Sequence, residues 1–288
     1  MSTQLIQRFA ESRRLPRSYV EDAERWILPF ATGIADLPRK RPHILGINGS
    51  QGSGKSTLSA LLAELFEERG LHTAIMSLDD FYFDRASRAK LAAEHHPLLV
   101  TRGVPGTHDV ELALATLKAI TDGETVALPR FDKANDEPLP QSQWPVVSGA
   151  SLDILIFEGW CLGAEPQNSE MLEHACNRLE KEEDRDGRWR RFVNDALAGS
   201  YQSLFQKVEQ LLLLQAPSFD CVTAWRDKQE EELRESQKTQ SQGVMSPSEI
   251  VRFVQHFERL THHCLTTLPA RADKVFKLDS SQRIIAAS

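Results

Sequence analysis

Residues 49–56 read G-S-Q-G-S-G-K-S and match the phosphate-loop pattern G-x-x-x-x-G-K-S/T. Glycines in this pattern let the backbone turn its N–H groups toward an anion, and a helix that follows directly adds the positive end of its dipole. We expect Lys55 to reach the β- and γ-phosphates of a nucleotide and Ser56 to ligate Mg²⁺. The predicted nucleotide-binding residues are Gly49, Ser50, Gln51, Gly52, Ser53, Gly54, Lys55, Ser56 and Thr57.

Two adjacent carboxylates, Asp79 and Asp80, follow a predicted strand at 72–78 and precede Phe81 and Tyr82. Because parallel strands end at one edge of a sheet, these residues should lie near the phosphate loop. Phosphoryl transfer to an alcohol needs a group that orients the hydroxyl and accepts its proton, and we assign this role to Asp79. Asp80 and Tyr82 are expected to contact the acceptor. Alternatively, Asp80 holds Mg²⁺ through water or caps a helix.

The next acid at this edge is Glu158, which ends the apolar run 152–157. Phosphate-loop enzymes keep an acid near the metal at this position, so Glu158 is the second predicted Mg²⁺ ligand beside Ser56. Arg226 lies in a predicted helix farther along the chain and could neutralise charge on the transferring phosphoryl group. The alternative for Arg226 is an ordinary surface arginine.

The loop 103–109 reads G-V-P-G-T-H-D and offers Thr107, His108 and Asp109 to a small substrate. Asp109 is also a good N-cap for the helix that follows. Lys133 belongs to the charged turn P-R-F-D-K at 129–133, which follows a short predicted strand. We expect Lys133 to bind the acceptor, and a charged surface turn is the alternative interpretation.

Strand and helix patterns alternate along most of the chain and predict the elements that position these residues. Strands are expected at 43–48, 72–78, 126–128, 152–157, 211–214 and 275–278, and helices near 55–69, 85–95, 109–121, 219–238 and 247–265. The alternation predicts an α/β fold with a doubly wound, mostly parallel sheet. Residues 1–40 are expected to form a helical N-terminal extension, and residues 41–288 one catalytic domain.

A charged helical insert is expected at about 163–205. Its segment 178–191 is dense in both charges and is either a solvated helix or a mobile lid that carries arginines over the phosphates. The polar segment 237–248 is predicted to be a loop before a helix capped by Ser246 or Ser248.

The bulk composition excludes several classes of protein. The net charge of -7 argues against nucleic acid as the main partner. No apolar stretch approaches the roughly 20 residues of a membrane span, and the first residues contain no apolar signal core. The four cysteines form no C-x-x-C pair, which is typical of reduced thiols. We therefore expect a cytoplasmic protein without a membrane partner, either a monomer or a homodimer.

Seven blocks together resemble the D-glycerate 3-kinase family, which is related to uridine kinase, phosphoribulokinase and pantothenate kinase. They are G-I-N-G-S-Q-G-S-G-K-S-T at 46–57, S-L-D-D-F-Y at 77–82, G-V-P-G-T-H-D at 103–109, P-R-F-D-K at 129–133, E-G-W at 158–160, W-R-D-K-Q-E at 225–230 and F-E-R-L-T at 257–261. The phosphate loop is shared by the whole superfamily, whereas the L-D-D-F-Y and P-G-T-H-D blocks together occur in far fewer proteins. These two blocks therefore carry the resemblance to this family.

This resemblance implies the phosphate-loop nucleoside triphosphate hydrolase fold with a helical lid, and an enzyme that uses ATP and Mg²⁺. It implies transfer of the γ-phosphoryl group to D-glycerate, giving 3-phosphoglycerate, with Asp79 as the base. Two alternatives stay open: a kinase for another hydroxylated metabolite, such as a nucleoside, pantothenate or a sugar phosphate, and a nucleotide-dependent switch protein. The pocket that Asp79, Phe81 and Tyr82 offer to an acceptor favours the kinase.

Overall fold

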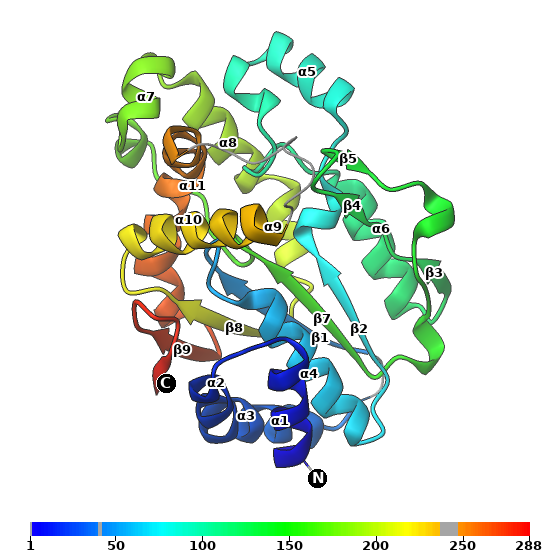
Figure 1. The fold of residues 1–288 in the computed structure, drawn as a ribbon. Helices are drawn as coiled ribbons and strands as arrows, with labels where there is room; N and C mark the ends of the chain where they lie inside the picture. Colours follow the sequence, from blue (N-terminus) through cyan, green and yellow to red (C-terminus); the bar gives the residue numbers. More distant parts are fainter. Residues whose placement is uncertain (1, 40–41, 237–246) are drawn as a thin grey trace.

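A six-stranded sheet forms the centre of the computed structural model, which describes residues 2–39, 42–236 and 247–288 (Figure 1). Its strands in spatial order are β10 (Ile284–Ala287), β9 (Lys274–Leu278), β8 (Gln210–Gln215), β1 (His43–Gly49), β7 (Ile154–Gly159) and β2 (Thr73–Ser77). All neighbours pair in parallel except β9 and β10. The predicted doubly wound, mostly parallel sheet is therefore confirmed.

Apolar side chains on both faces explain why the central strands are buried. In β7, Leu155 and Phe157 pack into one hydrophobic cluster, whereas Ile154 and Ile156 pack into the cluster on the opposite face. Successive side chains of a strand point to opposite faces, so a continuous apolar run suits a strand covered by helices on both sides.

Helices cover both faces of the sheet. One face packs against α1 (Ser2–Ser12), α2 (Arg17–Asp22), a π-helical turn (Ala23–Ile27), α3 (Leu28–Ala35), α4 (Lys55–Glu68) and α10 (Phe219–Ser236). The other face packs against α6 (Val110–Thr121) and α9 (Ser200–Phe205), and α11 (Pro247–Thr267) contributes to both clusters.

A smaller helical group lies beyond the carboxyl ends of the strands, at the top of Figure 1. It contains α5 (Arg85–Glu94), α7 (Arg178–Glu183) and α8 (Arg188–Ala198), with short 3₁₀ turns at Pro97–Val100 and Glu170–Leu172. A separate hydrophobic cluster that includes Leu98, Leu179 and Trp189 holds this group together. The predicted insert 163–205 is thus largely helical, and its action as a lid stays a prediction.

The short strand predicted at 126–128 is present, but the expectation that it belongs to the parallel sheet is wrong. β3 (Thr125–Ala127) lies outside the central sheet and pairs antiparallel with β6 (Val146–Ser148). A second small hairpin is formed by β4 (Phe131–Asp132) and β5 (Glu137–Pro138). A three-residue apolar run does not specify its partner, and here β3 packs against α6 instead.

Other short elements complete the chain. They are the 3₁₀ turns Leu78–Phe81, Gln141–Gln143, Gly149–Ser151 and Leu268–Ala270. The predicted loop 237–248 falls largely on residues 237–246, which lie outside the described residues. Pro247 begins α11, so Ser248 lies inside this helix and not at its cap.

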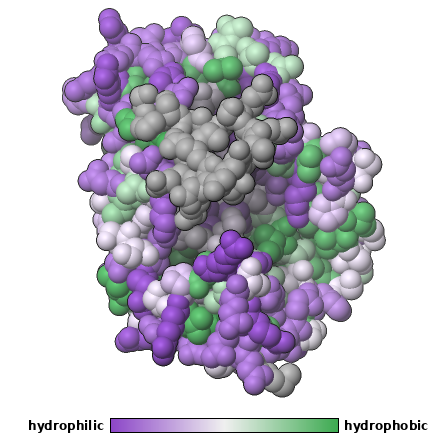
Figure 2. All heavy atoms as spheres, in the orientation of Figure 1, coloured by the Kyte–Doolittle hydropathy of each residue, from purple (hydrophilic) through white to green (hydrophobic). Residues whose placement is uncertain are grey.

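The surface is mainly hydrophilic on the face shown in Figure 2, and hydrophobic spheres gather mostly on the side that carries β3. Val146 in the neighbouring β6 is among the exposed large hydrophobic residues. Within the described residues, no helix has both the length and the apolar character that crossing a membrane requires.

The N-terminal helices share a hydrophobic cluster with the sheet and are joined to it by a buried charge. The carboxylate of Asp22, which is 6% exposed, accepts hydrogen bonds from Arg283 Nε at 2.7 Å and Nη2 at 2.8 Å. It also accepts the backbone N–H of Ile284 at 3.0 Å. This contact fixes the beginning of β10 to the helical layer. The expected domain boundary at residue 40 stays a prediction.

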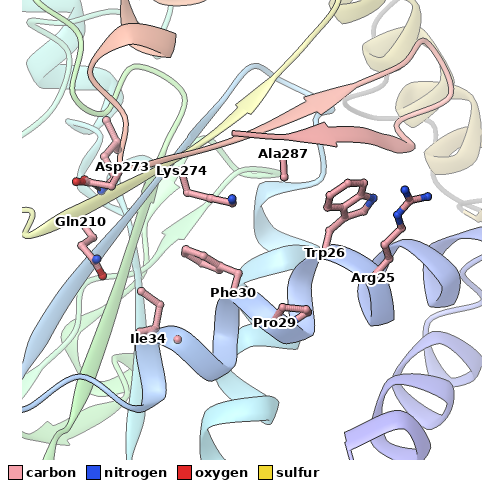
Figure 3. A pocket seen from close by; sticks show the side chains of 11 residues that line it. Arg25, Trp26, Pro29, Phe30, Ile34, Gln210, Asp273, Lys274 and Ala287 are labelled. Atoms are coloured by element: carbon pink, nitrogen blue, oxygen red, sulfur yellow. Dashed lines mark hydrogen bonds between the residues drawn. The ribbon is translucent and has the colours of Figure 1, made fainter.

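A cavity of about 590 Å³ lies between these helices and the sheet. Trp26 and Phe30 from the helices and Lys274 from β9 point toward it (Figure 3). Gln210 and Lys274, which also line it, are the first residues of β8 and β9. The cavity is therefore at the amino-terminal edge of the sheet, opposite the edge where the phosphate loop begins.

We predict that Asp22→Ala lowers the free energy of unfolding by about 2 kcal/mol, because it removes the acceptor of a buried backbone N–H and of a guanidinium. Urea denaturation followed by circular dichroism would measure the change. The matched control is Glu21→Ala, which removes an exposed carboxylate 3.5 Å from Arg283 and should change stability little. Equal losses in the two variants would contradict the importance of the buried contact.

Candidate active site

The phosphate loop leaves β1 at its carboxyl end and enters α4. Gly52 and Gly54 have positive φ angles of 75° and 90°, which favour glycine. A Cβ at Gly52 would lie 2.6 Å from Cβ of Trp225, so close packing against α10 also requires glycine there. These constraints hold the loop in the shape that turns its backbone N–H groups toward an anion.

Two hydroxyls of the loop, those of Ser50 and Ser53, could donate hydrogen bonds to the phosphate oxygens of a nucleotide. Ser50 Oγ, Gln51 Oε1 and Ser53 Oγ are buried and have no hydrogen-bond partner within the described part of the chain. Buried polar groups are normally paired, so these atoms suit the binding of a polar ligand. The loop therefore fits the nucleotide phosphates that its sequence predicts.

Lys55 is the residue expected to contact the phosphates, and Ser56 is one of the two expected to contact the metal ion. The Lys55 ammonium donates to the Ser50 carbonyl at 3.0 Å. Burial lowers the pKa of Lys55, and the negative charges of Glu158 and Asp79 offset part of this effect. Ser56 Oγ donates to Glu158 Oε1 at 3.3 Å, so the two predicted metal ligands lie together.

A metal at Ser56 and Glu158 would need further oxygen ligands. Within the described residues, no cluster of three His, Cys, Asp or Glu side chains is placed to hold a metal ion. Mg²⁺ commonly uses one or two protein oxygens together with phosphate oxygens and water. The hydroxyl and carboxylate therefore fit a Mg²⁺ ion that binds together with a nucleotide.

Asp79 is close enough to Lys55 for their charges to interact, and both of its carboxylate oxygens accept hydrogen bonds. Oδ1 accepts from the Tyr82 hydroxyl at 2.6 Å, and Oδ2 accepts from the Lys133 ammonium at 2.5 Å. Burial acts to raise the pKa of Asp79. The charge and hydrogen bond of Lys133, together with the hydrogen bond from Tyr82 and the charge of Lys55, nevertheless hold the pKa below its ordinary value.

Asp80 anchors the β4–β5 hairpin, and its expected contact with the acceptor stays a prediction. Its carboxylate accepts from Arg130 Nη1 at 3.2 Å and from the backbone N–H of Phe131 at 3.2 Å. Burial raises the pKa of Asp80 to about 6, although Arg130 and the Phe131 N–H act in the opposite direction. The structure brings Asp79 and Lys133 together through this anchored hairpin.

His108 lies next to Tyr82 but is buried. The two rings are 4.6 Å apart, and His108 Nδ1 lies 2.6 Å from the Tyr201 hydroxyl. His108 Nε2 is buried without a partner within the described part of the chain. Burial lowers the pKa of His108 to about 4, with the Asp79 charge acting against this effect, so the ring is neutral near pH 7.

Thr107 and Asp109 have structural partners. Thr107 Oγ1 accepts from the Gly103 N–H at 3.0 Å and donates to the Val104 carbonyl at 2.7 Å, which closes the loop. The Asp109 carboxylate accepts from the Leu112 N–H at 2.9 Å and caps α6, as the alternative interpretation proposed. Substrate contacts of these two residues stay predictions.

The arginines considered for the transferring phosphoryl group have other contacts here. The Arg226 guanidinium lies 5.7 Å from the ring centre of Phe253. In the insert, Arg190 Nη1 pairs with Asp184 at 3.0 Å and Arg188 donates to the His95 carbonyl at 2.6 Å. The catalytic role of Arg226 stays a prediction.

The residues that contact the phosphate loop from distant positions in the chain were not identified in the sequence analysis. Trp225 packs on Gly52, and its indole N–H donates to the Ser280 carbonyl at 2.8 Å. Gln282 Nε2 donates to the Gly52 carbonyl. The W-R-D-K-Q-E block contained Trp225, but no local pattern identifies Gln282.

We predict that the neutral state of His108 makes stability depend on pH. The pKa is about 4 in the folded protein against an ordinary value of 6.5, so the unfolded chain binds more protons between these values. The free energy of unfolding should therefore fall as the pH decreases from 6.5 to 4. His108→Gln should reduce this fall, measured by urea denaturation over this pH range.

His256, whose pKa burial also lowers to about 4, should keep its own share of this pH dependence in the His108→Gln variant. The matched control is His72→Gln at an exposed position. An equal reduction in both variants would contradict the assignment to His108.

Comparisons with known proteins indicate the family of this chain. The profile of the phosphoribulokinase/uridine kinase family matches residues 44–165. The chain is 36% identical over 234 residues to the uncharacterized kinase mug58 of Schizosaccharomyces pombe, covering 76% of this chain and 80% of that protein. It is 28% identical over 260 residues to the chloroplastic D-glycerate 3-kinase of Arabidopsis thaliana, covering 85% of this chain but only 53% of that relative.

A solved structure is similar over nearly the whole chain. The D-glycerate 3-kinase of Cryptococcus neoformans superposes with a TM-score of 0.73, covering 92% of this chain and 98% of that chain at 24% identity. This likeness supports the fold. Given the family profile and the similarity to the Schizosaccharomyces pombe kinase, the chain belongs to the phosphoribulokinase/uridine kinase family of phosphate-loop kinases.

Proposed function

We propose that this kinase transfers the γ-phosphoryl group of ATP to a hydroxyl of D-glycerate and forms 3-phosphoglycerate, with Mg²⁺ bound beside the phosphates. The observation that carries the proposal is the arrangement of two charged groups of residues. Lys55, Ser56 and Glu158 form the donor side, and the Asp79–Lys133 pair forms the acceptor side.

The donor side provides electrostatic stabilisation. The loop N–H groups and the Lys55 ammonium would hold the β- and γ-phosphates, where negative charge shifts during transfer. Ser56 and Glu158 would hold Mg²⁺, which supplies charge neutralisation when it is bound. Burial makes these interactions stronger than they are in water.

The acceptor side provides orientation and a base. The Asp79 carboxylate would accept a hydrogen bond from the acceptor hydroxyl and take its proton as the oxygen bonds to phosphorus. Burial and then the Asp79 charge raise the pKa of Tyr82, so its phenol stays protonated and fixes the carboxylate by donating to Oδ1.

The identity of the acceptor is supported by similarity and by charge. The relatives named D-glycerate 3-kinase match most of this chain. Glycerate carries a carboxylate, which a lysine beside the base could bind. We therefore propose a small molecule as the acceptor. The expected cytoplasmic location stays a prediction.

Steady-state assays across a panel of acceptors test this proposal. We expect D-glycerate to give a higher kcat/KM than glycerol, uridine or pantothenate, and phosphorus NMR should identify the product as 3-phosphoglycerate. Turnover of another alcohol without turnover of D-glycerate would refute the acceptor. ATP hydrolysis that no acceptor changes would instead favour a switch protein.

We predict that Asp79→Asn lowers kcat about 10³-fold, because the amide cannot accept the hydroxyl proton, while ATP affinity stays close to wild type. Lys55→Ala should weaken both turnover and ATP binding. Asp122→Asn, at an exposed position at the end of α6, is the matched control and should leave both unchanged. Wild-type turnover in Asp79→Asn would show that another group is the base.

A further inference from the structure

We infer that Lys133 recognises an anionic group of the acceptor, and that it holds Asp79 in an ion pair until such an acceptor binds. This inference rests on the proposed function and specifies how the same site selects its substrate. Its basis is the 2.5 Å contact between Lys133 Nζ and Asp79 Oδ2, at the place where the acceptor hydroxyl must approach the base.

The ion pair makes Asp79 a poor partner for an incoming hydroxyl. The Lys133 ammonium takes one acceptor position on Oδ2, and the Tyr82 hydroxyl takes one on Oδ1. A carboxylate whose negative charge is paired is also a weaker base. Asp79 therefore becomes a stronger base when Lys133 turns to another anion.

Other cations near the site are held by protein groups. Arg130 Nη1 pairs with Asp80 and donates to the Pro129 carbonyl at 2.8 Å, and its Nη2 donates to the Ile75 carbonyl at 3.2 Å. Arg102 pairs with Asp136, and its Nη2 donates to the Lys133 carbonyl at 3.1 Å. Both guanidinium groups thus have structural partners that an acceptor would have to displace.

The Lys133 side chain is free to change its partner. It follows β4 directly, and 60% of its side-chain surface is exposed. The backbone beneath it is fixed by the Asp80 contact with Phe131 and by the Arg102 contact with its own carbonyl. A flexible four-carbon stem on a fixed backbone allows the ammonium to turn from Asp79 to a ligand a few ångströms away.

The geometry also limits the class of acceptor. Because Lys133 and Asp79 touch, the anionic group and the reacting hydroxyl must be close within one molecule, as in a hydroxy acid with one or two carbons between them. In the transfer step the acceptor oxygen bonds to the γ-phosphorus, the bond from phosphorus to the β–γ bridging oxygen breaks, and ADP leaves. The hydroxyl proton passes to Asp79.

The Lys133→Met variant, assayed with D-glycerate and with its uncharged methyl ester, tests the inference. The variant should lower kcat/KM for D-glycerate roughly 10- to 100-fold, because a charge-assisted contact is lost. It should raise kcat/KM for the methyl ester above the wild-type value, because Asp79 is no longer paired. Lys133→Arg keeps the charge and should retain most of the preference for D-glycerate.

The matched control is Lys118→Met, which removes an exposed lysine of α6 that pairs with Asp122. This variant should leave kcat/KM unchanged for both substrates. Equal losses with both substrates in Lys133→Met would show a merely structural role and overturn the inference. Unchanged kinetics would overturn it as well. Failure of the proposed function can be distinguished from failure of this inference. The wild-type enzyme would then show no turnover with D-glycerate, and the inference would fail with the proposed function.

Discussion

Parallel pairing of three strands, β1, β7 and β2, is the constraint on which the candidate site depends. Ile47 lies opposite Glu158 in one pair of strands, and Glu158 lies opposite Ser77 in the other. The chain therefore leaves all three strands at one level, and the phosphate loop, Glu158 and Asp79 start from neighbouring positions. The apolar side chains of β7 bury the sheet on both faces.

Charged side chains are concentrated at this edge of the sheet, and they form two groups. Lys55 is buried next to the loop, with the negative charges of Glu158 and Asp79 acting on it. Asp79 forms an ion pair with Lys133, which belongs to a hairpin outside the central sheet. The acceptor side therefore depends on the anchoring of that hairpin by Asp80 and Arg130, and the donor side depends on the loop itself. In the proposed function, this separation would allow the acceptor to be selected without changing the nucleotide cradle.

The sequence predicted those parts of the site that follow from local patterns. The phosphate loop, the strand before it and the helix after it have a strong local signature, and Asp79 and Glu158 follow from the ends of apolar runs. The partner of β3 and the strand β10 were missed, because short apolar runs do not specify which strand they pair with. The contact of Gln282 with Gly52 joins residues 230 positions apart, and no sequence spacing indicates it. The contact of Asp80 with Arg130 was not foreseen for a related reason, since the two residues lie 50 positions apart in the sequence.

The central claim is that one crevice holds the phosphate loop on one side and Asp79 on the other. A crystal structure with a non-hydrolysable ATP analogue, Mg²⁺ and D-glycerate tests it most directly. The account predicts the γ-phosphate between Lys55 and the acceptor hydroxyl, that hydroxyl within hydrogen-bond distance of Asp79, and the acceptor carboxylate at Lys133. A bound acceptor that does not contact Asp79, or a γ-phosphate away from Lys55, would contradict the account.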